Sequence, residues 1–388
     1  MAIYIGFDVH SQHTTYHVLN ERKEKVCKGR IPTQAPALMQ FSCEMLALDS
    51  EVHVAMESGG QSRWVTRTLL DNGLDAHVFH ATEVAAKRPK KEYKNDENDA
   101  KDLAHGMLQG MYEMEVYIPT DEAQQMRQNT VQRQHFVEMR SLSQVLAKAL
   151  LRARSLPVPK CLDSIKAWER LLKEHAGMGD LGFFLELHYQ SYVHAEKMVD
   201  LIEARMRQTC EVSTGVNEDI ELLTSIPGVG FVTAYALVGV IGELTRFPSA
   251  AQLSSYLGVV PRSYDSGNRR QAGHITRSGP WYMRKLLCQC AHQARKGSNP
   301  LAAYFYSVQG RSGSAKKAIV AVMHRIVRIG FQLLKTRKRF DSGHLKIHSE
   351  LDPKTGKVFW RMGSAAEPRR RNADPGATSV NAVAGNDS

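Results

Sequence analysis

The first 110 residues alternate short apolar runs with polar turns and stretches of helical spacing. Apolar runs at 3–9, 14–19 and 25–31, separated by polar turns, predict three strands. Helical spacing over 35–48, 62–70 and 95–108 alternates with strand-like runs at 51–56 and 76–80. We therefore expect an α/β domain over residues 1–118, with the order β-β-β-α-β-α-β-α.

The pattern changes after residue 118. Residues 121–155 contain neither Gly nor Pro and are rich in Gln, Arg, Leu and Ala, which predicts a long helix. Further helices are expected over 164–212, so that 119–218 forms a helical spacer or a dimerising hairpin. Residues 219–340 resume Gly and Pro punctuation and predict a compact, mainly α domain. The extension 341–388 is expected to be largely disordered, because apolar residues are sparse from position 363 onward.

Composition narrows the class of protein. The chain has 388 residues, of which 43% are hydrophobic and 23% charged, as in ordinary globular proteins. No run of about 18 apolar residues predicts a membrane span, and the first residues do not resemble a secretion signal. The six cysteines are scattered, which argues against a disulfide framework. We expect a cytoplasmic protein, without a membrane partner.

Positive charge is concentrated in one segment. The net charge is +11 overall, but it is −4 over 1–118, zero over 119–218, +14 over 219–340 and +1 over 341–388. Because the positive charge is confined to 219–340, we expect a polyanion to bind this segment, and nucleic acid is the first candidate. The alternative is a basic face that serves only solubility.

Four carboxylates lie at the ends of predicted elements. Asp8 ends the first strand, Glu57 ends the fourth, and Asp96 and Asp99 stand three apart at the start of a helix. The i, i+3 spacing places the last two on one helical face. The element order is that of a ribonuclease-H-like sheet, although a generic α/β domain fits it as well. Four such oxygen donors predict a Mg²⁺ site, because Mg²⁺ prefers oxygen ligands and relieves the repulsion among the acids.

Each acid also has a structural interpretation. Asp96 and Asp99 are favoured in a first helical turn by the helix dipole, and Asp8 can cap a turn. The neighbouring basic run 87–94 is either a solvated loop or a source of cations for a nucleic-acid backbone beside the acids.

The basic segment contains a glycine loop, I-P-G-V-G, that resembles the turn of a helix–hairpin–helix element. Gly228 and Gly230 in it would let the backbone approach a phosphate. The alternative is a tight helix–helix turn packed in a core. Cys288 and Cys290, with two histidines nearby, have the wrong spacing for a zinc finger and are expected to be helix residues.

A polar loop follows at 261–280. Ser266 and Gly267 stand in it, and three arginines come close behind: Arg269, Arg270 and Arg277. Arginine binds phosphate bidentately, but most serines in such loops only form turns. Residues 314–340 read as a basic amphipathic helix, in which Arg325 and Arg328 either contact phosphate or face solvent.

Together these motifs resemble the transposases of the insertion sequence 110 family, over residues 3–340. The resemblance rests on GFDVH, AMESGG, KNDENDAKDLA, IPGVG, RFPSAAQLSSYLGVVPRSYDSG and HITRSGPWYMRKLL. It implies a RuvC-like N-terminal domain, a coiled-coil middle and a C-terminal transposase domain. It also implies that Asp8, Glu57, Asp96 and Asp99 form a DEDD metal site. Asn95 departs from the family, whose members more often carry Thr there.

The resemblance further implies a mechanism and partners. Ser266 would be the nucleophile that joins DNA through a phosphoserine. Donor and target double-stranded DNA would be paired with a structured bridge RNA, and dimers would assemble into tetramers. Each active site would combine the RuvC-like domain of one protomer with the serine domain of another. In bacterial cytoplasm such an enzyme would act on the nucleoid.

Two other functions compete with RNA-guided recombination. One is a RuvC-like nuclease or Holliday-junction resolvase, in which the acids activate water and Ser266 is inert. The other is a non-enzymatic nucleic-acid-binding protein with a vestigial acid cluster. A covalent protein–DNA adduct separates the first from a recombinase, and binding without cleavage under any metal would favour the second.

Overall fold

The computed structural model describes residues 2–88, 95–266, 269–276, 278–341, 347–351 and 358–362. The chain divides into two compact units, residues 1–120 and residues 121–388. The helical spacer and the basic segment therefore belong to one unit, and each unit is described by itself. No helix in the described part of the chain is both long and apolar enough to cross a membrane.

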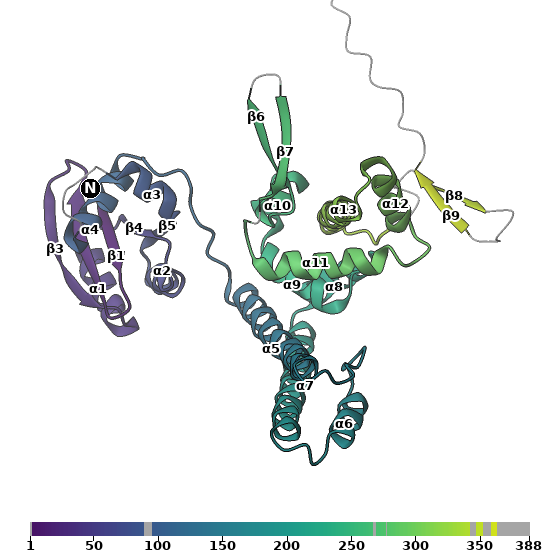
Figure 1. Cartoon of the computed structure of the whole chain (residues 1–388). Helices are drawn as coiled ribbons and strands as arrows, with labels where there is room; N and C mark the ends of the chain where they lie inside the picture. The colour runs from purple at the N-terminus through teal and green to yellow at the C-terminus, as the bar shows by residue number, and fades with distance from the viewer. Residues whose placement is uncertain are drawn as a thin grey trace, which may run out of the picture. The chain divides into compact units, whose positions relative to one another are not determined.

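Unit 1 is a mixed sheet with helices on both faces (Figure 1). Its sheet has the order β3-β2-β1-β4-β5, in which β2 runs antiparallel to β1 and β3, while β1, β4 and β5 are parallel. Its elements are β1 (Ile3–Val9), β2 (His13–Asn20), β3 (Lys25–Pro32), α1 (Ala35–Leu48), β4 (Val52–Glu57), α2 (Ser62–Asp71), β5 (Asp75–Phe79), α3 (Ala81–Lys87) and α4 (Asp96–Leu108).

The predicted strands and helices of this unit are confirmed to within a few residues at each end. Helix α3 was not predicted, because seven residues are too few for a clear 3.6-residue period. One face of the sheet packs against α1 and α2 through a core that includes Phe7, Leu38, Val54 and Val65. The other face carries α4, and Leu103 of that helix is buried among residues of β4, β5 and α3. The mixed α/β prediction for the N-terminal domain is therefore confirmed.

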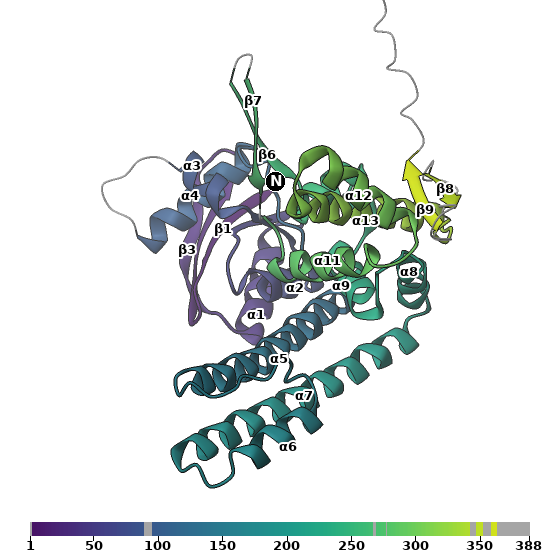
Figure 2. The same ribbon diagram turned by 45° about the vertical axis from the view of Figure 1, so that its right-hand side comes forward.

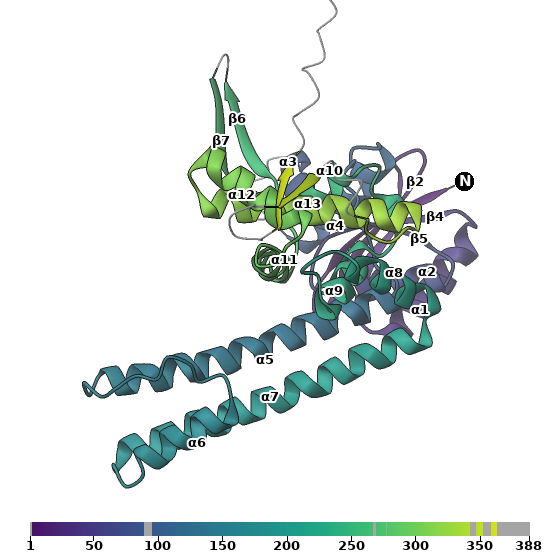
Figure 3. The same ribbon diagram turned by 90° about the vertical axis from the view of Figure 1, so that its right-hand side faces the viewer.

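Unit 2 begins with two long helices that run side by side (Figure 3). They are α5 (Asp121–Arg152) and α7 (Asp180–Val212), with the short α6 (Ile165–Glu174) between them in sequence. Two ion pairs fix their antiparallel register, Arg133–Glu203 at 2.7 Å and Arg140–Glu196 at 2.6 Å. Buried positions on α7 recur at spacings of three, four and seven residues, as in a coiled-coil seam.

The rest of unit 2 is mainly helical, as predicted. Its elements are α8 (Thr214–Thr224), α9 (Phe231–Ile241), the 3-10 helix η1 (Leu244–Arg246), α10 (Ala250–Tyr256), β6 (Pro261–Ser266), β7 (Arg269–Ile275), α11 (Trp281–Ala294), α12 (Pro300–Ser312) and α13 (Ala315–Thr336). One core joins these helices, with Tyr235, Leu287, Phe305 and Ile326 almost fully buried in it. Helices α11, α12 and α13 pack together here (Figure 2).

The extension contains one element that the sequence did not suggest. Strands β8 (Ile347–Leu351) and β9 (Val358–Met362) pair antiparallel. Composition misses this hairpin because a two-stranded pair needs few apolar residues. Residues 363–388, on which the expectation of disorder mainly rests, lie outside the described residues.

Candidate functional site

The sheet of unit 1 brings two of the four predicted acids to one edge. Asp8 is the second-last residue of β1, and Glu57 is the last residue of β4. These neighbouring strands are parallel and pair Phe7 with Met56, so the next positions along, Asp8 and Glu57, emerge side by side. The carboxyl ends of parallel strands share one edge of the sheet, which is where α/β proteins commonly place their sites.

Helix α4 supplies the other two acids. Its N-cap is Asn95, whose side-chain oxygen accepts the backbone N–H of Asn98 at 2.8 Å. Asp96 and Asp99 then fall in the first turn, where the helix dipole favours negative charge. The departure of Asn95 from the family pattern therefore preserves capping, because Asn and Thr both serve at this position.

Gly6 allows α4 to lie directly against β1. A Cβ at this position would overlap the carbonyl oxygen of Ala100 and stand 2.5 Å from the backbone nitrogen of Ala104. The close approach buries Asp99, which is 6% exposed, beside the end of β1. The glycine of the GFDVH motif thus brings the helical acids to the strand acids.

Cations bridge these acids in the structure. Arg88 Nη1 lies 3.1 Å from Asp99 Oδ1, and Arg88 Nη2 lies 3.4 Å from Glu57 Oε2. Arg88 therefore connects a strand acid to a helix acid, and both of these carboxylates must lie close to one guanidinium. The basic run 87–94 contributes this residue, while residues 89–94 lie outside the described residues.

The other pair of acids is connected by a histidine. His10 Nε2 lies 3.0 Å from Asp8 Oδ2 and 3.7 Å from Asp96 Oδ1, and Arg30 Nη2 lies 3.0 Å from Asp96 Oδ2. One ligand atom from each of Asp8, His10 and Asp96 lies within 4.8 Å of the others. All four predicted acids are therefore held in one neighbourhood by three cationic or titratable side chains.

The electrostatics of this cluster suit a cation. Burial raises the pKa of the Asp8 carboxyl, the charges of Asp99 and Asp96 add to the rise, and His10 opposes it. Crowded carboxylates repel one another, and a divalent cation relieves that repulsion while accepting their oxygens as ligands. Carboxylate oxygens fit Mg²⁺, and among the described residues Asp8, Asp96 and His10 are the members of this cluster whose ligand atoms lie within 4.8 Å of one another, so the imidazole widens the choice toward transition metals.

Sequence reasoning did not connect His10 and Arg30 to the cluster, whereas Arg88 belongs to the basic run 87–94, for which cations beside the acids were one of the two interpretations. His10 could have been found, since two residues along an extended chain return to the same side, as Asp8 and His10 do. Arg30 and Arg88 come from an antiparallel strand and from the end of α3, and no spacing in the sequence connects them to the acids.

The predicted serine lies in a hairpin of unit 2. Ser266 is the last residue of β6 and pairs with Arg269, while Asp265 pairs with Arg270. Figure 1 shows β6 and β7 extending away from α10 and α11. The backbone pairing places Arg269 and Arg270 of β7 opposite the serine end of β6. Gly267 and Arg277 lie outside the described residues, as do the side chains of residues 262–272.

The glycine loop forms a tight turn between α8 and α9. Gly228 has a φ of +85°, and a Cβ there would stand 2.6 Å from the carbonyl oxygen of Cys290 in α11. Close packing against α11 therefore explains why a glycine stands at this position. Gly230, the N-cap of α9, is exposed and has nothing within 4 Å of a built Cβ. Close approach of a phosphate to this loop stays a prediction, and Gly230 is the position open to it.

Alanine at these two glycines should separate packing from binding. Gly228→Ala should destabilise unit 2 by about 2–3 kcal/mol, because it combines a left-handed backbone with a clash against α11. Gly230→Ala should cost less than about 1 kcal/mol, since alanine fits its backbone and space. Calorimetric unfolding of both variants measures this difference. Equal losses of stability would contradict the packing role of Gly228.

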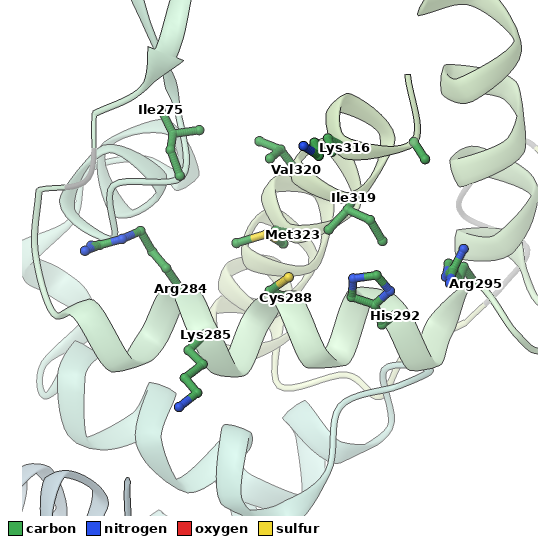
Figure 4. Close-up of a pocket in the computed structure, with 11 residues that line it drawn as sticks. Ile275, Arg284, Lys285, Cys288, His292, Arg295, Lys316, Ile319, Val320 and Met323 are labelled. Carbon is green, nitrogen blue, oxygen red and sulfur yellow. The ribbon is translucent and has the colours of Figure 1, made fainter. Parts of the chain in front are cut away.

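A pocket of about 490 Å³ lies between α11 and α13 in the basic segment (Figure 4). Its walls include Ile319, Val320 and Met323, and its rim carries four cationic side chains, Arg284, Lys285, Arg295 and Lys316. Cys288 also lines the pocket, whereas Cys290 is buried and its thiol donates to Thr233 Oγ1 at 3.2 Å. Both cysteines are helix residues, as expected.

The predicted arginines of α13 differ in their surroundings. Arg328 is exposed, whereas the guanidinium of Arg325 lies over the ring of Tyr304, 4.8 Å from its centroid. Burial lowers the pKa of His324, which directly precedes Arg325 on this helix, and the charges of Arg328 and Arg325 lower it further. The repulsion indicates a local excess of positive charge on this helix.

Two family models match the chain, one over unit 1 and the first helix of unit 2, and the other within unit 2. Residues 5–154 match the DEDD transposases of the IS110 type, and residues 220–307 match the model described as "Transposase IS116/IS110/IS902 family". The chain belongs to this family of transposases. The first match contains all four acids of the unit 1 cluster, and the second contains Ser266 and the glycine loop.

Several relatives of this IS110-family chain are known by name. A "Transposase for insertion sequence element IS1111A" of Coxiella burnetii is 25% identical over 60% of this chain and 63% of its own length. A "Pilin gene-inverting protein" of Moraxella lacunata is 27% identical over 46% of this chain and 56% of its own length. A "Transposase for insertion sequence element IS1328" of Yersinia enterocolitica is 26% identical over 61% of this chain and 69% of its own length. The chain thus spans about three fifths of the first two relatives.

Proposed function

We propose that this IS110-family chain is a DNA recombinase that moves an insertion sequence by cutting and rejoining donor and target DNA. The observation that carries the proposal is the gathering of Asp8, Glu57, Asp96 and Asp99 at one edge of the unit 1 sheet. The names of the relatives, which refer to transposition and to inversion of a pilin gene, support DNA recombination as the activity. The strand order and directions of unit 1 support a ribonuclease-H-like fold for the domain.

In this proposal the four acids of unit 1 hold Mg²⁺, which when bound stabilises negative charge on the scissile phosphate. His10 and Arg30 orient the outer carboxylates of Asp8 and Asp96, to which they are already hydrogen-bonded. Arg88 holds Asp99 and Glu57 together and brings a positive charge to the place where the phosphate binds. These positions are fixed before substrate arrives, which lowers the cost of organising the transition state.

Ser266 is the proposed nucleophile. Its hydroxyl oxygen attacks the phosphorus, and the bond between phosphorus and the 3′ oxygen breaks. The phosphate stays on the serine, and the serine proton ends on the released 3′-hydroxyl. A 3′-hydroxyl of the partner strand then attacks the phosphoserine, so that a new phosphodiester forms and the serine recovers its proton. Arg269 and Arg270, opposite the end of β6, stabilise the charge that develops on the phosphate.

The remaining parts of the chain suit a nucleic-acid assembly. The basic segment, its pocket rim and the exposed Arg328 would contact DNA and a bridge RNA whose base pairing selects the sites. The α5–α7 pair exposes large apolar side chains, among them Leu142, Val145 and Leu201, each more than half exposed. Exposed large apolar side chains favour association, so we assign this pair to dimerisation on the way to a tetramer.

Salt dependence tests the nucleic-acid contacts of the hairpin. Replacing Arg269 and Arg270 together with alanine should weaken DNA binding to all sequences alike. It should also make the plot of the logarithm of the DNA-binding constant against the logarithm of salt concentration less steep by about 2, because each phosphate contact contributes roughly 0.9 to that slope. Lys148→Ala with Lys166→Ala, in the helical part without net charge, is the matched control. An unchanged slope in the hairpin variant would contradict its role in phosphate binding.

The proposed function is tested by reconstitution. RNA that co-purifies with the full chain is sequenced, and the protein is incubated with that RNA, Mg²⁺, a donor duplex and a target duplex. Recombinant junctions between donor and target support the proposal. Cleaved but unjoined DNA would favour the nuclease, and binding without cleavage in Mg²⁺ or Mn²⁺ would favour a non-enzymatic protein.

A further inference from the structure

A second cluster of metal-ligating side chains lies on the same sheet of unit 1. His53 is in β4, and Asp75 and His77 are in the edge strand β5. The parallel register pairs His53 with Asp75 and Ala55 with His77, so all three side chains lie on one face. His53 stands four residues before Glu57, which places it about 13 Å along the strand from the acid site.

The three side chains converge on one point. His53 Nδ1 lies 2.7 Å from Asp75 Oδ2, and His77 Nε2 lies 3.0 Å from the same oxygen. One ligand atom from each residue lies within 4.8 Å of the other two. The histidine side chains are only 21% and 28% exposed, and the ring of Tyr4 stacks on His53 with centroids 5.2 Å apart. The rings are thus held in place, while Asp75 remains accessible to an ion from solvent.

A carboxylate holds the outer nitrogen of each ring. His53 Nε2 lies 3.2 Å from Glu51 Oε1, and His77 Nδ1 lies 2.9 Å from Glu115 Oε1. In metal sites a ligating histidine usually donates its other ring N–H to a carboxylate, which fixes the tautomer and directs the lone pair at the metal. Here Glu51 and Glu115 hold the outer nitrogens, and on metal binding His53 Nδ1 and His77 Nε2 would lose the protons that they now share with Asp75 and would ligate the ion.

Ordinary ion pairing is the competing explanation. Burial opposes both shifts, but the hydrogen bonds that His77 donates to Asp75 and Glu115 raise the pKa of His77, and those that Asp75 accepts from both histidines lower the pKa of Asp75. Charge pairing accounts for the distances to Asp75. It does not require that two rings from different strands converge on one carboxylate while each is held from behind by another.

We propose that His53, Asp75 and His77 bind a transition-metal ion, of which Zn²⁺ is the best match. Two imidazoles and one carboxylate form a three-ligand zinc set that leaves a fourth position for water. Imidazole ligands also discriminate against Mg²⁺, which prefers oxygen donors only. The ion would join β4 to the edge strand β5. Through the hydrogen bond of His77 to Glu115 it would also secure the segment that bridges to Phe79.

The test is zinc binding by the full chain in excess Mg²⁺, which keeps the acid site occupied. Isothermal titration should give one Zn²⁺ per chain in wild type and none in His77→Gln or His53→Gln. Glu115→Gln should weaken binding by about 10–100-fold, as the loss of an outer partner does. Co²⁺ in place of Zn²⁺ should give visible absorption of a four-coordinate site in wild type, and Zn²⁺ should raise the melting temperature of wild type but not of His77→Gln or His53→Gln.

Controls make the outcome decisive. His13→Gln, a change in another strand of the same sheet, and Asp8→Asn should both keep the full zinc stoichiometry. If Asp8→Asn abolishes zinc binding while His77→Gln retains it, the ion binds at the acid site and the proposal is wrong. Absence of micromolar binding to folded wild type would overturn it equally. Circular dichroism establishes that each variant is folded before titration.

Discussion

Asp8→Asn is expected to reduce strand exchange by at least about 100-fold. The variant keeps the shape of the side chain but removes a negative oxygen ligand at the end of β1. Stabilisation of a phosphoryl transition state by a bound metal contributes several kcal/mol, and each 1.4 kcal/mol or so corresponds to tenfold in rate. The measurement is the rate of joined product from donor and target duplexes. Full activity in this variant would remove the acid cluster from the mechanism.

The same variant should be more stable than wild type at pH 7 in chelator. The pKa of Asp8 is raised in the folded state, so its carboxyl contributes stability at low pH that is lost as pH rises through the folded pKa. Asparagine carries no charge and avoids that loss. Mg²⁺ should therefore raise the melting temperature of wild type and have less effect on the variant. A variant that melts lower than wild type in chelator would contradict this account of the site.

Glu97→Gln is the matched control for these measurements. Glu97 stands beside Asp96 in the first turn of α4, but it is exposed and pairs with Lys28 on the sheet at 2.6 Å. Activity and the Mg²⁺ effect should both be unchanged. Asp99 is less suitable than Asp8 for alanine substitution, because it is buried and paired with Arg88. Breaking a buried pair leaves an uncompensated charge and costs about 3–5 kcal/mol.

Ser266→Ala is expected to abolish both strand exchange and any covalent protein–DNA species. A phosphoserine survives denaturing gels, so wild type with Mg²⁺, RNA and a donor duplex should show a shifted band. The variant should still bind DNA, since the lost hydroxyl makes at most about one net hydrogen bond worth about 1 kcal/mol. Ser266→Cys should retain weak activity at most, because a thiolate is a softer nucleophile than the serine oxygen.

Ser263→Ala, on the same strand β6, is the control for the hairpin. It should retain both the adduct and strand exchange. An adduct that persists in Ser266→Ala would move the nucleophile elsewhere, with Ser263 and Tyr264 tested next. If wild type cuts DNA without ever forming an adduct, the recombinase proposal fails. A hydrolytic enzyme, in which the unit 1 acids activate water, then replaces it.

The alternation of short apolar runs determined most of unit 1, because most strands there bury at least one face and the longer helices α1, α2 and α4 have a 3.6-residue period. The four acids were predictable for a related reason: strand ends and first helical turns are readable from local pattern. The strong charge of 219–340 was equally visible, since it needs only counting. The chemistry of Ser266 was different, because nothing in its local sequence distinguishes it from a turn serine, and only the family resemblance singled it out.

Tertiary structure decided what the pattern could not connect. Arg30 reaches Asp96 from β3, and Arg88 reaches Asp99 and Glu57 from the end of α3, so both contacts depend on how these elements pack, including the close approach of α4 at Gly6. For Gly228 the local sequence left a phosphate contact and a packed turn as alternatives, and the structure shows the close packing against α11. The convergence of His53, Asp75 and His77 depends on the register of two parallel strands that a helix separates in sequence. Contacts between distant segments have no local signal, so the sequence predicted the elements and their acids, and the fold determined which side chains meet.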